Sequence, residues 1–137
     1  MKALRILIMA IAIMMTSGAI AQTVYSSSGS NCGSIRSDGS VYSKSGSSIG
    51  KINSDGTVYN GSGSQIGKID RDGTFWSKSG SRIGKLDSDG TVRNSSGSSI
   101  GKVESDGTVR NGSGSSIGRV SGVPKEWAAA YFFFFFD

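Results

Sequence analysis

Positively charged side chains recur at a constant spacing through most of this 137-residue chain. A lysine or arginine stands in the same sequence context every 17 residues, as the step from Lys51 to Lys68 shows (68 − 51). The set consists of Lys51, Lys68, Lys85, Lys102 and Arg119. Regularly spaced cations suit a polyanion such as nucleic acid or an acidic cell-surface glycan, because they neutralise charges that are themselves regularly spaced. The set is therefore a candidate polyanion-binding site, although nothing in it predicts recognition of a specific nucleic acid.

Aspartates with the same spacing balance much of this charge. Each of them precedes a glycine, at Asp55, Asp72, Asp89 and Asp106. An Asp-Gly pair is typical of a turn, since the carboxylate can bond its own following backbone and glycine accepts a positive φ. A charge-balanced, solvated face is therefore the alternative interpretation of the regular cations.

The same composition argues against metal binding and catalysis. Residues 70–73 and 87–90 look like the start of a calcium loop, but neither continues with the further oxygen ligands and the final glutamate of an EF-hand. The chain has no histidine, so a serine nucleophile would lack its usual base. We expect no cofactor, no metal site and no enzymatic activity, with weak calcium binding kept as an alternative.

These residues belong to a repeat that organises the chain. Five whole units run from Cys32 to Ser116 without insertion or deletion, half a unit precedes them at 23–31, and half a unit follows from Ile117. A strict short period is the signature of a repeat array. The sole cysteine, Cys32, occupies an isoleucine position of the repeat and has no partner for an intramolecular disulfide.

Each unit predicts two short β-strands. Its apolar positions are few and mostly β-branched, for example Ile49, Ile52 and Val58, with Gly- and Ser-containing turns between them. We favour a short-repeat β-solenoid, because a corner at Gly50 would place all three aliphatic side chains inside. The alternative is an antiparallel β-hairpin meander, which pairs Ile52 with Val58 but turns Ile49 to the opposite face.

The two ends of the chain differ from the repeat. Residues 1–21 have two basic residues, an apolar run at 6–15 and a small-x-small site before Gln22, which predicts a cleaved signal peptide. Removing Lys2 and Arg5 lowers the net charge from +5 to +3. We therefore expect a periplasmic or extracellular protein whose repeat array covers residues 22–120.

Residues 121–137 form a separate C-terminal segment. Pro124 can start a short helix, and the run from Tyr131 to Phe136 is too apolar to remain in water. We expect this aromatic segment to fold as a cap over the last repeat. The alternative is contact with a membrane or a partner, because the run is too short to span a bilayer.

The unit I-G-K-I-x-S-D-G-T-V-x-N resembles short repeats of secreted bacterial proteins, several of which also end in an Ala-Ala-Phe-rich tail. The resemblance covers residues 23–137 and implies a β-repeat fold and export, without an activity. We therefore expect a non-enzymatic, exported structural or surface-binding protein that contacts a cell-surface glycan or another copy of itself. The alternative is a small polyanion- or calcium-binding module.

Overall fold

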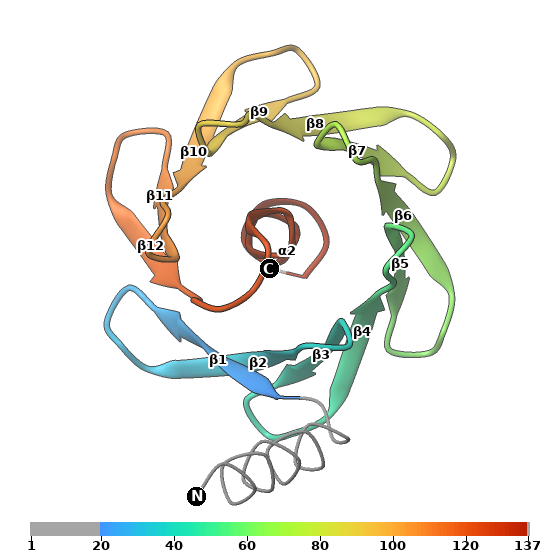
Figure 1. Cartoon of the computed structure of the whole chain (residues 1–137), viewed down its shortest axis with the longest axis vertical. Helices are drawn as coiled ribbons and strands as arrows, with labels where there is room; N and C mark the ends of the chain where they lie inside the picture. The colour runs from blue at the N-terminus through green and yellow to red at the C-terminus, as the bar shows by residue number, and fades with distance from the viewer. Residues whose placement is uncertain (1–19, 137) are drawn as a thin grey trace, which may run out of the picture.

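Twelve β-strands form a closed barrel around a central helix (Figure 1). The structure is a computed structural model and describes residues 20–136, so residues 1–19 of the predicted signal peptide lie outside the described residues. The strands are β1 Ala21–Ser26, β2 Asn31–Arg36, β3 Ser40–Ser43, β4 Ser48–Ile52, β5 Thr57–Asn60, β6 Gln65–Ile69, β7 Thr74–Ser77, β8 Arg82–Leu86, β9 Thr91–Asn94, β10 Ser99–Val103, β11 Thr108–Asn111 and β12 Ser116–Arg119.

Every strand pairs antiparallel with its neighbours in sequence, and β12 closes the ring by pairing with β1. The connections therefore alternate between the two ends of the barrel. The Asp-Gly turns lie at one end, which we call the turn end. The Gly-Ser connections lie at the other end and form the wide loops around the rim of Figure 1, which we call the petal loops. The petal loops are residues 27–30, 44–47, 61–64, 78–81, 95–98 and 112–115.

The prediction of an all-β repeat is confirmed, but the solenoid is wrong. Identical residues of adjacent units lie two strands apart, which corresponds to roughly 10 Å instead of the roughly 4.8 Å of stacked coils. The solenoid prediction depends on Ile49, which a regular hairpin would turn to the opposite face from Ile52 and Val58. A β-bulge removes that objection: Val41 pairs with Gly50 and Tyr42 with Ser48, so that Ile49 is an extra residue. Ile49 is half-buried against the core, and Ile52 pairs with Val58 as the meander alternative predicted.

Alternation along the strands separates the core from the outer wall. Ile52 is 1% exposed and Val58 is 0% exposed, whereas Lys51, between Gly50 and Ile52, points outward. The turn end packs each unit onto the next one. Gly56 has φ +93°, and a Cβ at this position would overlap the carbonyl oxygen of Ile69 in the following unit. Glycine is therefore needed in the Asp-Gly turn both for its backbone conformation and for lack of space.

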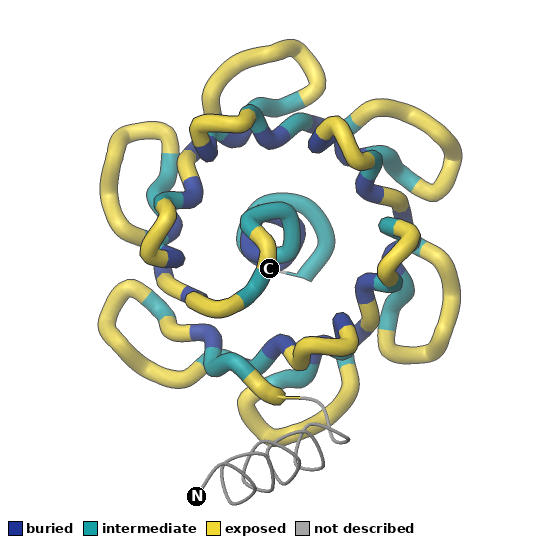
Figure 2. The backbone as a smooth tube through the Cα atoms, viewed as in Figure 1, coloured by how far each residue is buried: buried dark blue, intermediate teal, exposed yellow. Residues whose placement is uncertain are grey.

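The C-terminal segment lies inside the barrel. After β12 the chain passes through residues 121–124 and enters the ring as helix α2, Lys125–Ala129, which continues as the π-helix η1, Ala130–Phe134. Figure 2 shows this helix at the centre of the ring, with buried positions recurring around the ring. A closed ring has no terminal repeat to cover, so the cap prediction is wrong. Residues 125–136 instead fill the interior of the barrel, and we call them the plug.

The plug fits the barrel one residue per hairpin. Its aromatic side chains lie against inward-facing glycines taken in reverse chain order. The pairs are Phe132 with Gly118, Phe133 with Gly101, Phe134 with Gly84, Phe135 with Gly67 and Phe136 with Gly50. Tyr131 completes the series near Gly33, where its hydroxyl donates to the carbonyl oxygen of Cys32 at 3.2 Å. The glycine of each I-G-K motif therefore provides the space that one aromatic ring fills.

The π-helical winding helps this fit. An α-helix rotates by about 100° per residue, whereas adjacent hairpins of this ring are separated by only a sixth of a turn, since twelve strands form six hairpins. The wider π-helix, marked by the hydrogen bond from Phe135 N to Ala130 O at 2.8 Å, rotates less per residue. Successive side chains consequently point toward successive hairpins.

Candidate binding surface on the outer wall and the two ends

The five predicted polyanion-binding residues encircle the barrel. Each stands on the outer face of an even-numbered strand between β4 and β12, and Lys51, for example, pairs with Ser40 on one side and Tyr59 on the other. Neighbouring members are two strands apart and point away from a common axis. The structure therefore distributes Lys51, Lys68, Lys85, Lys102 and Arg119 around the wall and does not gather them on one face.

An aspartate of the preceding unit stands near each of these cations. Asp55 accepts a hydrogen bond from the backbone N–H of Thr57 at 3.0 Å. This bond, then the Thr57 hydroxyl and then the charge of Lys68 lower the pKa of the Asp55 carboxyl. The same arrangement joins Asp38 with Lys51, Asp72 with Lys85, Asp89 with Lys102 and Asp106 with Arg119. The aspartates stay ionised and offset the basic set locally.

Among the described residues, the carboxylates at the turn end do not come together as metal ligands. Within residues 20–136, no three His, Cys, Asp or Glu side chains lie close enough together to hold a metal ion. The aspartate of each turn already uses one oxygen for its own backbone, as Asp89 does with Thr91 N at 2.9 Å. The geometry thus gives the calcium alternative no assembled ligand set in the described part of the chain.

A coupled pair of outward side chains spans several of these turns, and sequence reasoning missed it. Arg93 Nε donates to Asp87 at 2.8 Å, and Arg110 Nε donates to Glu104 at 3.1 Å. In an earlier unit the pair is Trp76 Nε1 and Asp70, also at 2.8 Å. In the first unit the guanidinium of Arg36 lies 4.5 Å from the centre of the Tyr42 ring. The signal in the sequence was the joint change of two positions six residues apart.

The petal loops are exposed but internally bonded. Asn60 Oδ1 accepts the backbone N–H groups of Ser62 and Ser64, both at 3.0 Å. Where serine replaces asparagine, Ser43 Oγ accepts the N–H of Ser47 at 3.2 Å. A Cβ added to Gly63 would meet no atom within 4 Å, so the tip of this loop is surrounded by solvent. Each petal loop thus presents exposed serine hydroxyls on a backbone that is hydrogen-bonded to a side chain at its start.

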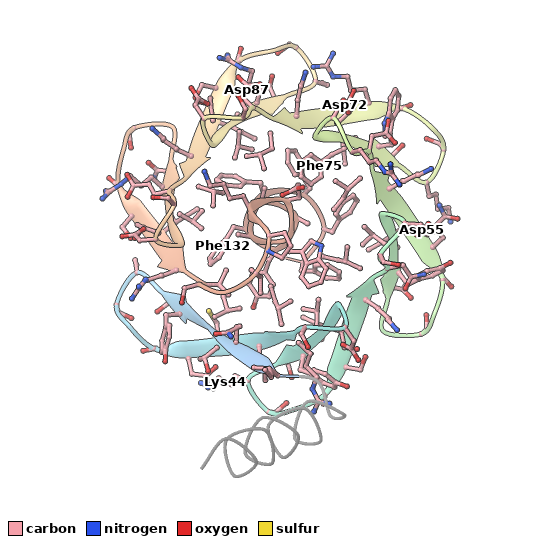
Figure 3. The ribbon with its side chains drawn as sticks, viewed as in Figure 1. Lys44, Asp55, Asp72, Phe75, Asp87 and Phe132 are labelled. Carbon is pink, nitrogen blue, oxygen red and sulfur yellow. The ribbon has the colours of Figure 1, made fainter. Side chains whose placement is uncertain are left out.

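The structure also locates the aromatic run at the C-terminus, for which membrane contact was an alternative. The rings of Phe132 to Phe136 lie against the barrel glycines, and Figure 3 shows the labelled Phe132 inside the ring, beside the central helix. Among the described residues, the helices are all too short and insufficiently apolar to cross a bilayer. Contact of the aromatic run with a membrane therefore remains a prediction.

The arrangement defines a class of protein: a closed antiparallel barrel of repeated hairpins that encloses its own C-terminal helix. The chain belongs to the family described as 5-fold beta-flower protein, whose model matches residues 21–136. The present chain closes its ring with six hairpins, as its twelve strands require. No curated protein and no solved structure matches the chain.

Proposed function

We propose that this protein is a non-enzymatic, exported binding protein that attaches to carbohydrate through its outer surface. The observation that carries the proposal is the filled barrel. Ala128, Ala129 and Ala130 are at most 1% exposed, and the aromatic rings that follow occupy the glycine niches. Within residues 20–136, the helix and its aromatic rings thus occupy the axis of the barrel, and we place the partner on the outside.

The outside carries the groups that carbohydrate recognition uses. A sugar ring has an apolar face, which packs on aromatic side chains, and a rim of hydroxyls, which exchange hydrogen bonds with hydroxyl, amide and charged groups. Tyr25 is 42% exposed on the wall, and Tyr42, Tyr59 and Trp76 are half-exposed at equivalent positions. The petal loops add serine hydroxyls, and the asparagines at the ends of β5, β9 and β11 add amide groups beside three of them. Their repetition around the ring suits a repetitive partner.

Export is supported by the boundary between the predicted signal peptide and the barrel. Cleavage after Ala21 would leave Gln22 to Ser26 of β1, including the core residue Val24, which is 0% exposed. The mature chain would therefore keep the strand that closes the ring. Mass spectrometry of the exported protein should find Gln22 at its N-terminus, and retention of the full chain in the cytoplasm would contradict this part of the proposal.

Co-sedimentation with insoluble polysaccharides of neutral, amino-substituted and acidic chemistry tests the binding function. We expect the full chain to be retained by at least one of them, released by the matching soluble saccharide, and not released by salt. The control is the double variant Lys44→Ser, Lys78→Ser, because serine occupies the same petal position at Ser27 and Ser95. The control should be retained equally. Lack of retention throughout, or release by salt alone, would overturn the proposal.

A further inference from the structure

One unit departs from the others in its charged and aromatic residues. Arg71 stands where the other units have serine, at Ser37, Ser54, Ser88 and Ser105. The same unit has Phe75 in place of valine and Trp76 in place of tyrosine or arginine. Phe75 has a structural reason, since it stacks on Phe134 with ring centroids 4.4 Å apart. Arg71 has none, because serine completes the same turn elsewhere and Arg71 makes no hydrogen bond or ion pair within residues 20–136.

Arg71 stands at the lip of a depression at the turn end. The depression has a volume of about 440 Å³ and lies between two Asp-Gly turns and the start of helix α2. Its apolar part includes Trp127 and the edges of Ile52 and Ile69. Its polar part includes Asn53, Asp55, Asp70 and Glu126. A depression of this size, lined by an aromatic side chain and several polar groups, has the general form of a small-ligand site.

Several of the polar groups have capacity left for a ligand. Asp70 uses Oδ2 for the indole N–H of Trp76, and Asp55 uses Oδ1 for Thr57, so each keeps a second oxygen. The Asn53 side chain has no hydrogen-bond partner among the described residues, and it offers both a donor and an acceptor. Trp127 is half-buried and lines the same space. A ring with one apolar face and several hydroxyls matches this combination.

The charge of the depression restricts the ligand further. Three carboxylates, those of Asp55, Asp70 and Glu126, line the depression together with one guanidinium, that of Arg71. An acidic sugar would be repelled, whereas a neutral or amino-substituted sugar would not. A second depression of about 260 Å³ shares Arg71 and Glu126 with the first one. The two together can accommodate more than one sugar ring.

We propose that the depression at Arg71 and Trp127 is a binding site for a short neutral or amino-substituted oligosaccharide. This inference rests on the proposed carbohydrate-binding function and assigns it to one unit of the ring. Trp127 packs on the apolar face of a sugar ring, Arg71 donates to its hydroxyl or carbonyl oxygens, and Asp55, Asp70 and Asn53 accept from its hydroxyl or amino groups.

Titration calorimetry of the full chain with a glucosamine trimer, a glucose trimer and a galacturonate trimer tests the site. We expect at least one of the first two to bind and the acidic trimer to bind more weakly or not at all. The variant Arg71→Ser restores the sequence of the other units and should fold normally, with an unchanged thermal melt. It should weaken binding about tenfold, as expected for loss of a hydrogen bond to a charged group. The matched control Arg82→Ser also restores the repeat, lies outside the depression, and should bind as the parent protein does.

Fluorescence supplies a second readout that does not depend on the arginine. The chain has two tryptophans, and Trp76→Tyr, the residue found at Tyr42 and Tyr59, leaves Trp127 as the single indole. Saccharide should change the emission of Trp127 in this variant. If a polysaccharide retains the protein but Arg71→Ser binds normally and Trp127 emission is unaffected, the site is wrong and the proposed function stands. If neither the trimers nor any polysaccharide bind, both are wrong.

Discussion

Phe134 occupies the space that the absent side chain of Gly84 leaves in β8, and it stacks on Phe75 of β7, the residue that pairs with Gly84. The contact of Phe134 with Gly84 shows how the ring and its plug pack against each other. A Cβ on Gly84 would overlap the Phe134 ring and also the backbone carbonyl oxygen of Arg93, although no unusual backbone angle requires glycine there. The cost of a side chain at this position is therefore steric.

Gly84→Ala should lower the free energy of unfolding by about 1–3 kcal/mol, the usual range for overpacking a filled core. Gly112→Ala is the matched control, because a Cβ there would find its nearest neighbour 3.6 Å away. Urea denaturation of both variants checks the difference. Equal midpoints for the two variants would show that Phe134 does not fill the niche.

Removal of the plug is expected to abolish the fold. If the segment capped the last repeat, deletion of residues 123–137 would leave the β-structure intact and expose one end to self-association. In the closed barrel the same deletion empties the interior and leaves Val58 and its equivalents without packing partners. The truncated protein should therefore lose its cooperative melt in circular dichroism.

A second variant distinguishes the filling of the barrel interior from the length of the C-terminal segment. Replacement of Phe132 to Phe136 by leucine keeps an apolar plug of somewhat smaller volume, and it should retain the β-spectrum with a lower melting temperature. A truncated chain that melts like the full protein would contradict the plug role and return the tail to the anchor interpretation.

Much of the unit was readable from its residues. Asp55-Gly56 predicted the turn, and the alternation of Lys51 and Ile52 predicted an outer and an inner face, because both follow from local geometry. Strand direction was not readable. The choice between solenoid and hairpin depends on Ile49, which the bulge leaves half-buried. In the sequence, a half-buried isoleucine cannot be told from a fully buried one.

The closure of the ring and the position of the plug were also beyond the sequence. From the sequence, the glycine of each I-G-K motif is interpreted as a corner of the chain. Only the contact of Gly50 with Phe136 reveals it as a niche for an aromatic ring. The depression at Arg71 combines turn residues with Trp127, which the plug brings to the turn end. Such a site needs the tertiary fold before its parts can be connected, although the departure of Arg71 from serine was a visible signal.

Alkaline pH should loosen the attachment of the plug. Burial chiefly raises the pKa of Tyr131 to about 12, and its bond to Cys32 acts in the same direction. Because the fold favours the neutral phenol, its stabilising contribution is complete below the ordinary pKa of about 10 and is lost as the pH rises from about 10 to about 12. Melting temperatures across this range should fall more steeply for the parent protein than for Tyr131→Phe. Parallel curves would contradict the assignment.

The basic set provides the last prediction, because the barrel changes what its members do. Lys51, Lys68, Lys85 and Lys102 stand roughly two strand spacings apart, about 10 Å, so they repel one another less than they would in a stacked row. Each is near an ionised aspartate of the preceding unit. Replacing all four with glutamine should therefore lower the melting temperature slightly at low salt, and the difference should vanish at high salt, where exposed charges are screened.

Retention on a polyanionic resin should be weak for the parent protein and little changed in the variant. A variant that melts at a higher temperature and also loses strong polyanion retention would show that the lysines repel one another and bind a polyanion, and it would restore the polyanion-binding interpretation.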